Sequence, residues 1–141
     1  ESCDLCDVTC ATCDEASSAD CLSCNTGRYF FSESKTCVES CPGSKYGNEG
    51  QVCADCHSSC LTCDGPLETN CTTCDSSKIF VPHESKCTDP CPVGTYETSQ
   101  QCLRCSALCL TCDGATKNDC LSCPDSKYFL LSNSSCVDSC P

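Results

Sequence analysis

Cysteines recur along the chain in three sets of eight with identical spacing. Each set reads C-x2-C-x3-C-x2-C-x7-C-x2-C-x12-C-x3-C-P, and the second and third sets follow at offsets of 50 and 49 residues. Self-similarity at such a period is typical of an array of small structural units. The pattern therefore predicts three repeats, at residues 1–50, 51–100 and 101–141, the last with a truncated exit loop.

The chain contains little besides cysteine with which to form a core. Of its 141 residues 24 are cysteine, four are Phe, four are Tyr and none is Met or Trp. A cysteine content above roughly 8–10 % in a short secreted chain indicates a scaffold in which disulfides replace burial. We therefore predict a small disulfide-rich fold, an elongated tandem array with short β-hairpins and little or no helix. An ordinary globular enzyme, a helical bundle and a membrane-spanning protein are disfavoured.

Three further features recur in the frame of the cysteines. The twelve-residue gap of each repeat contains strand-favouring residues, which we expect to form one arm of a hairpin. These clusters are residues 28–31, 78–81 and 127–130. The fourth cysteine of each repeat is followed by a predicted turn residue, Asp14, Asp64 or Asp113, and then by glycine in the last two repeats. Tyr46 and Tyr96 follow the exit proline and are expected to pack on neighbouring disulfides.

The charge balance excludes several classes of partner. The formal net charge is −12, of which residues 102–141 carry only −1. A strongly acidic surface repels nucleic acid, heparin-like polyanions and anionic lipid headgroups. No apolar run approaches the ~20 residues of a membrane-spanning helix, so we expect no direct membrane insertion of this segment.

The cysteine spacing resembles that of the furin-like cysteine-rich repeat. The resemblance covers residues 3–141 and includes the exit segment Cys91-Pro92-Val93-Gly94-Thr95-Tyr96. Repeats of this type occur in growth-factor receptors, in some proprotein convertases and in repeat-rich surface proteins of ciliates and other protists. The resemblance is specific for fold and unspecific for function.

Spacing alone leaves the disulfide connectivity open, because eight cysteines allow many pairings. The resemblance implies one scheme: second with fourth, third with fifth, sixth with seventh, and eighth with the first of the next repeat. The implied pairs within repeats are Cys6–Cys13, Cys10–Cys21, Cys24–Cys37, Cys56–Cys63, Cys60–Cys71, Cys74–Cys87, Cys105–Cys112, Cys109–Cys120 and Cys123–Cys136. The implied pairs between repeats are Cys41–Cys53 and Cys91–Cys102.

Cys3 and Cys140 have no partner in this scheme. By the same pattern, Cys3 would bond a preceding repeat and Cys140 a following one. We therefore expect the native chain to continue in both directions, or copies of it to bond end to end. A direct join of Pro141 to Glu1 would leave three residues between the two cysteines, against eleven and ten at the internal junctions. This comparison favours one longer chain.

Cysteine pairs also serve metal and redox chemistry. Nine C-x2-C pairs occur, but zinc sites built from them belong to reducing compartments, and the ferredoxin spacing for iron–sulfur clusters is absent. Nine equivalent pairs favour structure over one redox-active dithiol. We therefore expect no metal and no cofactor. Calcium stays open, because acidic residues are plentiful although no EF-hand-type loop is present.

Few residues are candidates for catalysis or modification. His57 and His83 occur only in the second repeat, where we expect them to lie at the surface, and no Ser-His-Asp arrangement follows from their spacing. Asn133-Ser134-Ser135 is an N-glycosylation sequon, and Asn70-Cys71-Thr72 is a formal one. We expect at least one N-linked glycan, at Asn133.

These observations predict a non-enzymatic extracellular or cell-surface protein made in the secretory pathway. It would be a rigid, protease-resistant rod or a coat or fibre component, with neighbouring repeats or copies of itself as partners. The alternative is a ligand-binding or adhesive stalk of a cell-surface receptor, which a charged or aromatic patch present in only one repeat would indicate. A third reading is an accessory region of an enzyme whose catalytic domain lies elsewhere.

Overall fold

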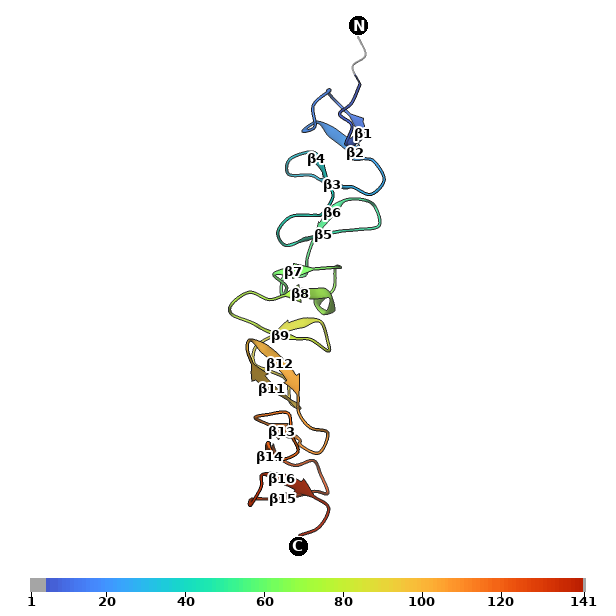
Figure 1. Cartoon of the computed structure of the whole chain (residues 1–141). Helices are drawn as coiled ribbons and strands as arrows, with labels where there is room; N and C mark the ends of the chain where they lie inside the picture. The colour runs from blue at the N-terminus through green and yellow to red at the C-terminus, as the bar shows by residue number, and fades with distance from the viewer. Residues whose placement is uncertain (1–4, 141) are drawn as a thin grey trace. The chain divides into compact units, whose positions relative to one another are not determined.

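The structure, a computed structural model, describes residues 5–140 of the chain (Figure 1). Within this range it contains sixteen short strands, no α-helix and one 3-10 turn, η1 (Glu68–Asn70). The chain divides into two compact units, the first ending at Thr73 and the second beginning at Cys74. The second sequence repeat therefore contributes to both units. The repeat bounds at 1–50, 51–100 and 101–141 stay a prediction.

The first unit consists of antiparallel hairpins that follow one another in chain order (Figure 1). They are β1–β2 (Cys10–Cys13 and Cys21–Cys24), β3–β4 (Tyr29–Phe31 and Thr36–Val38), β5–β6 (Lys45–Gly47 and Cys53–Asp55) and β7–β8 (Thr62–Cys63 and Cys71–Thr73). No strand exceeds four residues, because cystines and turn residues bound each one. The hairpin predicted at residues 28–31 is β3–β4.

The second unit contains one larger sheet and two hairpins. Its sheet has the order β10-β9-β12-β11 and comprises β9 (Ile79–Val81), β10 (Lys86–Thr88), β11 (Thr95–Thr98) and β12 (Gln101–Arg104). The hairpins are β13–β14 (Thr111–Cys112 and Cys120–Ser122) and β15–β16 (Tyr128–Leu130 and Ser135–Val137). The strand clusters predicted at residues 78–81 and 127–130 are thus β9 and β15, each one arm of a hairpin.

The same backbone contact occurs once in each unit, where one sequence repeat meets the next. In the first unit the Phe30 N–H donates to the Gln51 carbonyl oxygen at 2.7 Å, and in the second the Phe80 N–H donates to that of Gln100 at 3.0 Å. Both glutamines adopt left-handed backbone conformations, with φ of 57° and 60°. Each junction is therefore a short parallel contact between a hairpin strand and the turn that precedes β6 or β12.

Cystines form the interior. Within residues 5–140, Val81 is the only buried hydrophobic residue that is not a cysteine. Phe30 packs against the cystine cluster of the first repeat, and Tyr96 packs against that of the third, as expected for Tyr96. The predicted fold class, disulfide-rich with short β-hairpins and little helix, is confirmed.

The Asp-Gly turns differ from the sequence-based interpretation. Neither Gly65 nor Gly114 adopts a positive φ. Glycine is needed there for space, because a Cβ would lie 2.7 Å from the Asn70 Oδ1 atom and 2.8 Å from the Asp119 carboxylate. The loop is closed through the backbone, with the Asp64 N–H donating to the Asn70 carbonyl at 3.0 Å.

Candidate functional site

Eleven disulfides hold the hairpins together, and their paired Cα atoms lie between 5.0 and 5.7 Å apart, as disulfide geometry requires. The pairs are those that the resemblance implies. Within repeats they are Cys6–Cys13, Cys10–Cys21, Cys24–Cys37, Cys56–Cys63, Cys60–Cys71, Cys74–Cys87, Cys105–Cys112, Cys109–Cys120 and Cys123–Cys136. Between repeats they are Cys41–Cys53 and Cys91–Cys102.

One of the two cysteines that the scheme leaves over belongs to the described residues. Cys140 is an exposed free thiol. Cys3 lies outside the described residues. The bonds expected for them with cysteines beyond residues 1–141 stay predictions.

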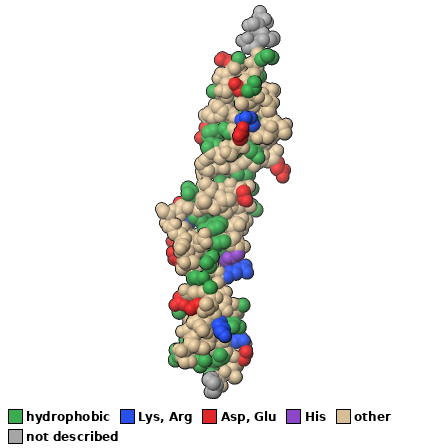
Figure 2. All heavy atoms as spheres, in the orientation of Figure 1, with side chains coloured by type: hydrophobic (Ala, Val, Ile, Leu, Met, Phe, Trp, Pro, Cys, Tyr) green, Lys and Arg blue, Asp and Glu red, His purple; other side chains and the backbone are tan. Residues whose placement is uncertain are grey.

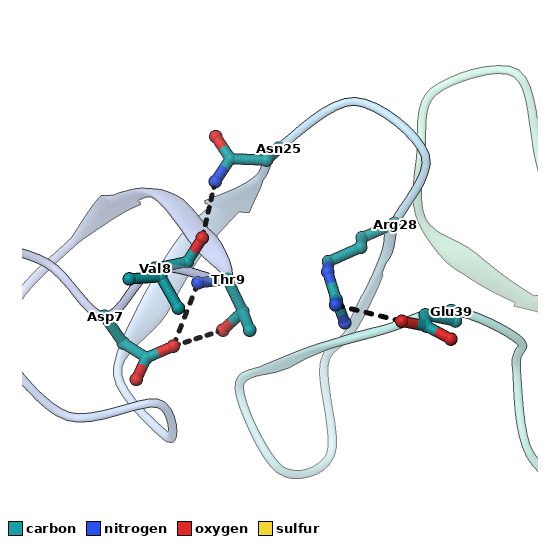
Figure 3. Close-up of polar contacts among 6 residues, drawn as sticks. All are labelled: Asp7, Val8, Thr9, Asn25, Arg28 and Glu39. Carbon is teal, nitrogen blue, oxygen red and sulfur yellow. Dashed lines mark hydrogen bonds and ion pairs between the residues drawn. The ribbon is translucent and has the colours of Figure 1, made fainter.

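One position caps a loop in all three repeats. The Asp7 Oδ1 atom accepts the Thr9 backbone N–H at 2.9 Å and the Thr9 hydroxyl at 2.6 Å (Figure 3). These hydrogen bonds hold the pKa of the Asp7 carboxyl below its ordinary value. The same position in the second repeat is His57, whose Nδ1 atom accepts the Ser59 N–H at 3.2 Å, and in the third it is Ser106. His57 is therefore a turn-capping residue at the surface.

Polar contacts also close each of the first two hairpins of the chain. The Asn25 side-chain amide donates to the Val8 carbonyl oxygen at 2.9 Å (Figure 3). Arg28 and Glu39 form an ion pair of 3.0 Å across the β3–β4 hairpin. The equivalent pair in the third repeat joins Lys127 to Asp138 at 2.5 Å. Exposed pairs of this kind stabilise a fold only slightly, so their repetition marks a shared framework more than a site.

The two glycosylation candidates differ in accessibility. Asn133 is exposed in the turn between β15 and β16, and its Oδ1 atom accepts the Ser135 hydroxyl at 2.7 Å. Asn70 is half-buried, and its Oδ1 atom accepts the Leu67 backbone N–H at 3.1 Å. The next residue, Cys71, is buried in a disulfide. Asn133 therefore offers the more accessible amide.

An open groove lies beside each junction. The first junction groove has a volume of about 410 Å³ and is lined by Phe31, Glu33, residues 42–45 and Asp55. The second junction groove has a volume of about 350 Å³ and is lined by His83, Glu84, residues 92–95, residues 104–107 and Cys109. Because the sequence offsets match, the two grooves are built from equivalent segments of successive repeats.

Charged side chains occupy the first junction groove with their own ion pairs. The Lys45 ammonium lies 3.1 Å from Glu33 and 2.5 Å from Asp55, and its side chain is only 18 % exposed. Hydrogen bonds from Lys45 to Asp55 and then Glu33 raise the pKa of Lys45. The positive charge of Lys45 in the first junction groove is therefore already neutralised by two carboxylates of the chain itself.

The second junction groove has a different set of charges. Glu84 pairs with Lys86, and the His83 Nε2 atom lies 3.5 Å from the Glu84 carboxylate. The hydrogen bond from Lys86 and the positive charges of Lys86, His83 and Arg104 lower the pKa of Glu84. Figure 2 shows a histidine side chain bordering on Lys or Arg side chains on the visible face. Sequence reasoning noticed His83 but not Arg104, since only the structure brings the two segments to one groove.

Residues 5–140 contain no group of three or more His, Cys, Asp or Glu side chains arranged to hold a metal ion. In the same range no helix has the length and apolar character needed to cross a membrane.

Comparison with known proteins gives a partial likeness. No protein-family model matches the chain. The chain is 43 % identical over 49 residues to proprotein convertase subtilisin/kexin type 6 of Rattus norvegicus, and 41 % identical over 49 residues to the protein of that name from Homo sapiens. Each match covers 35 % of this chain and 5 % of the other protein, a stretch as long as one repeat. The chain is thus a disulfide-rich repeat protein with one repeat-length likeness to proprotein convertases.

Proposed function

We propose that the chain is a furin-like cysteine-rich segment of an extracellular, non-enzymatic structural or surface protein. It acts as a rigid, protease-resistant spacer, or as a component of a coat or fibre, within a longer array of repeats. One observation carries this proposal: the two junctions between repeats are built from the same disulfide and the same backbone hydrogen bond. A junction that is formed in the same way between successive repeats is suited to an extended array.

The disulfide content supports the extracellular location. Disulfides persist in oxidising compartments and are rare in the cytosol. Small chains that cannot bury a large apolar core depend on such cross-links. The partial likeness to a proprotein convertase agrees with the resemblance on which the furin-like assignment rests.

The third repeat offers the same junction surface to a neighbouring repeat or to another copy. Phe129 in β15 stands at the register position of Phe30 and Phe80. Within residues 5–140 its N–H finds no acceptor outside its own hairpin. Cys140 stands at the position of Cys41 and Cys91, which bond the first cysteine of the next repeat. The Phe129 N–H would donate to a carbonyl in the turn of a neighbouring repeat, and the Cys140 thiol would form a disulfide with its first cysteine.

Native material tests this proposal. It would be digested without reduction, with free thiols alkylated beforehand, while a second portion is viewed by electron microscopy. We expect Cys140 in a disulfide-linked peptide with a cysteine outside residues 1–141 or on another copy, and rods or assemblies in the images. An alkylated Cys140 in a population of dispersed, flexible monomers contradicts the proposal.

A second function is favoured by the second junction groove. A ligand-binding or adhesive stalk would carry a patch that its other repeats lack, and the charges around His83 and Arg104 have no counterpart in the first groove. The spacer function does not require this difference.

A further inference from the structure

The two junction grooves are built from equivalent backbone segments and differ in charge. The residues that line both occupy matching positions in successive repeats, so the first groove serves as a reference for the second. The matched positions are Glu33 and His83, Lys45 and Thr95, and Asp55 and Arg104. At each of the three positions the second groove has lost the charge of the first or reversed it.

In the first groove the central cation is already neutralised. Lys45 lies between two carboxylates, so an incoming anion would meet the net negative charge of Glu33, Lys45 and Asp55. The Asp55 side chain is 80 % exposed at the rim. This groove therefore repels a further carboxylate.

In the second groove the position of Lys45 holds an uncharged residue, and the position of Asp55 holds a positively charged one. Thr95 replaces the lysine, and its hydroxyl donates to the Pro92 carbonyl at 2.6 Å, which leaves the floor uncharged. Arg104 replaces the aspartate, and within the described residues its side chain forms no ion pair or hydrogen bond. Glu84 also lines this groove, and its ion pair with Lys86 balances its charge, so Glu84, Lys86 and Arg104 together carry one net positive charge.

The side chain of Arg104 in the second groove matches one small anion. Arg104 presents a planar guanidinium fork, the geometry that pairs with a carboxylate. His83 and Ser106 line the same groove. The His83 Nε2 atom faces the Glu84 carboxylate at 3.5 Å, and the Ser106 hydroxyl keeps a proton to donate. The whole chain carries a net charge of −12, which opposes a long polyanion but tolerates a single negative group.

We propose that the second junction groove is a binding site for a single carboxylate, an Asp or Glu side chain of a partner polypeptide, held between Arg104 and His83. This site goes beyond the spacer function and does not rest on it. The interaction is weak when isolated, because the groove is open, and it gains strength only with the remainder of an interface. A partner would therefore present one acidic side chain among uncharged neighbours.

The test uses the 141-residue chain and two peptides, acetyl-Gly-Glu-Gly-amide and the Gln peptide of otherwise identical sequence. Nuclear magnetic resonance at low ionic strength follows the imidazole Cε1–H signals and the Arg104 Nε–H signal. We expect the Glu peptide to shift the signals of His83 and Arg104 at millimolar concentration. His57, whose ring is engaged with Ser59, serves as the internal reference and keeps its position. Equal shifts from both peptides, or equal shifts of both histidines, overturn the proposal.

Two matched variants complete the test. Arg104→Asp installs the residue found at this position in the first groove, and we expect it to weaken Glu-peptide binding by about fivefold or more. The triple variant Glu33→His, Lys45→Thr and Asp55→Arg transfers the second groove's residues to the first, and we expect it to create a second site of similar affinity. An unchanged non-reducing peptide map shows that each variant keeps its disulfides. If the Arg104→Asp variant has its native disulfides and binds the Glu peptide as strongly as the unchanged chain, the site is refuted. This result would leave the spacer function untouched.

Discussion

The ring of Tyr29 lies directly over Gly47, where an added Cβ would come within 2.2 Å of the ring. Tyr29 belongs to β3 and Gly47 to β5, so this contact joins the hairpin of the first repeat to the exit hairpin that leads to the second. In the next repeat the matching residues are Ile79 and Glu97. In the second repeat the hairpin residue is thus smaller than Tyr29, and the exit-strand residue is larger than Gly47.

This contact predicts the effect of one methyl group. Gly47→Ala should destabilise the first junction by about 1–3 kcal/mol, because overpacking forces the ring or the strand to move. Amide hydrogen exchange measures the change locally, and we expect faster exchange at the Phe30 N–H, which donates to Gln51. The double variant Tyr29→Ile, Gly47→Ala should restore protection. Unchanged exchange in the single variant would show that the contact carries no strain.

The disulfide between Cys91 and Cys102 should govern the second junction. Replacing both by Ser removes a bridge that spans 11 residues, a loss of roughly 2–3 kcal/mol in the chain-entropy model. We expect the Phe80 N–H, bonded to Gln100 across this junction, to lose protection from hydrogen exchange. The control replaces Cys105 and Cys112, whose bridge lies outside the junction, and should leave Phe80 protected. The prediction fails if both double variants affect Phe80 alike.

Acid should weaken the loop that Asp7 caps. Its carboxyl pKa lies below the ordinary value of 3.8 in the folded chain, so the bond to Thr9 stabilises the fold above that value and is lost as the pH falls through the folded pKa. The Thr9 amide proton signal should titrate with a midpoint below 3.8. Asp7→Ser, which copies Ser106 of the third repeat, should abolish this titration. A midpoint at or above 3.8 in the native chain would contradict the assignment.

A glycan should be found at Asn133 and not at Asn70. Asn133 is exposed in a turn, whereas Asn70 is half-buried and precedes a buried cystine. Protein secreted from a eukaryotic host should lose the mass of one glycan on treatment with N-glycosidase. Asn133→Gln should remove this shift and Asn70→Gln should leave it unchanged. A glycan on Asn70 would count against the accessibility argument.

Much of the fold could be predicted because cysteine spacing recurs without error. The β3–β4 hairpin and the packing of Tyr96 follow from residue type and position alone. The hairpins at β1–β2, β7–β8 and β13–β14 were not expected, since their strands are too short to show a hydrophobic period. They form because disulfides bring segments of two to four residues into register.

The candidate site was harder to predict because it depends on contacts between segments distant in sequence. His83 and Arg104 are separated by twenty residues, and no motif joins them. The role of His57 was hidden for another reason: its counterparts, Asp7 and Ser106, share only the ability to accept a hydrogen bond. Aligning the repeats by their cysteines would have shown both positions, but only the structure shows what each position does.

The bonds that the two junctions share are a cystine and a main-chain hydrogen bond, neither of which depends on the charged side chains nearby. Repeats that differ in these charges can consequently be joined in the same way. Surface residues beside such a joint are then free to diversify. The exchange of Asp55 for Arg104 at one and the same structural position is an instance of that freedom within a single molecule.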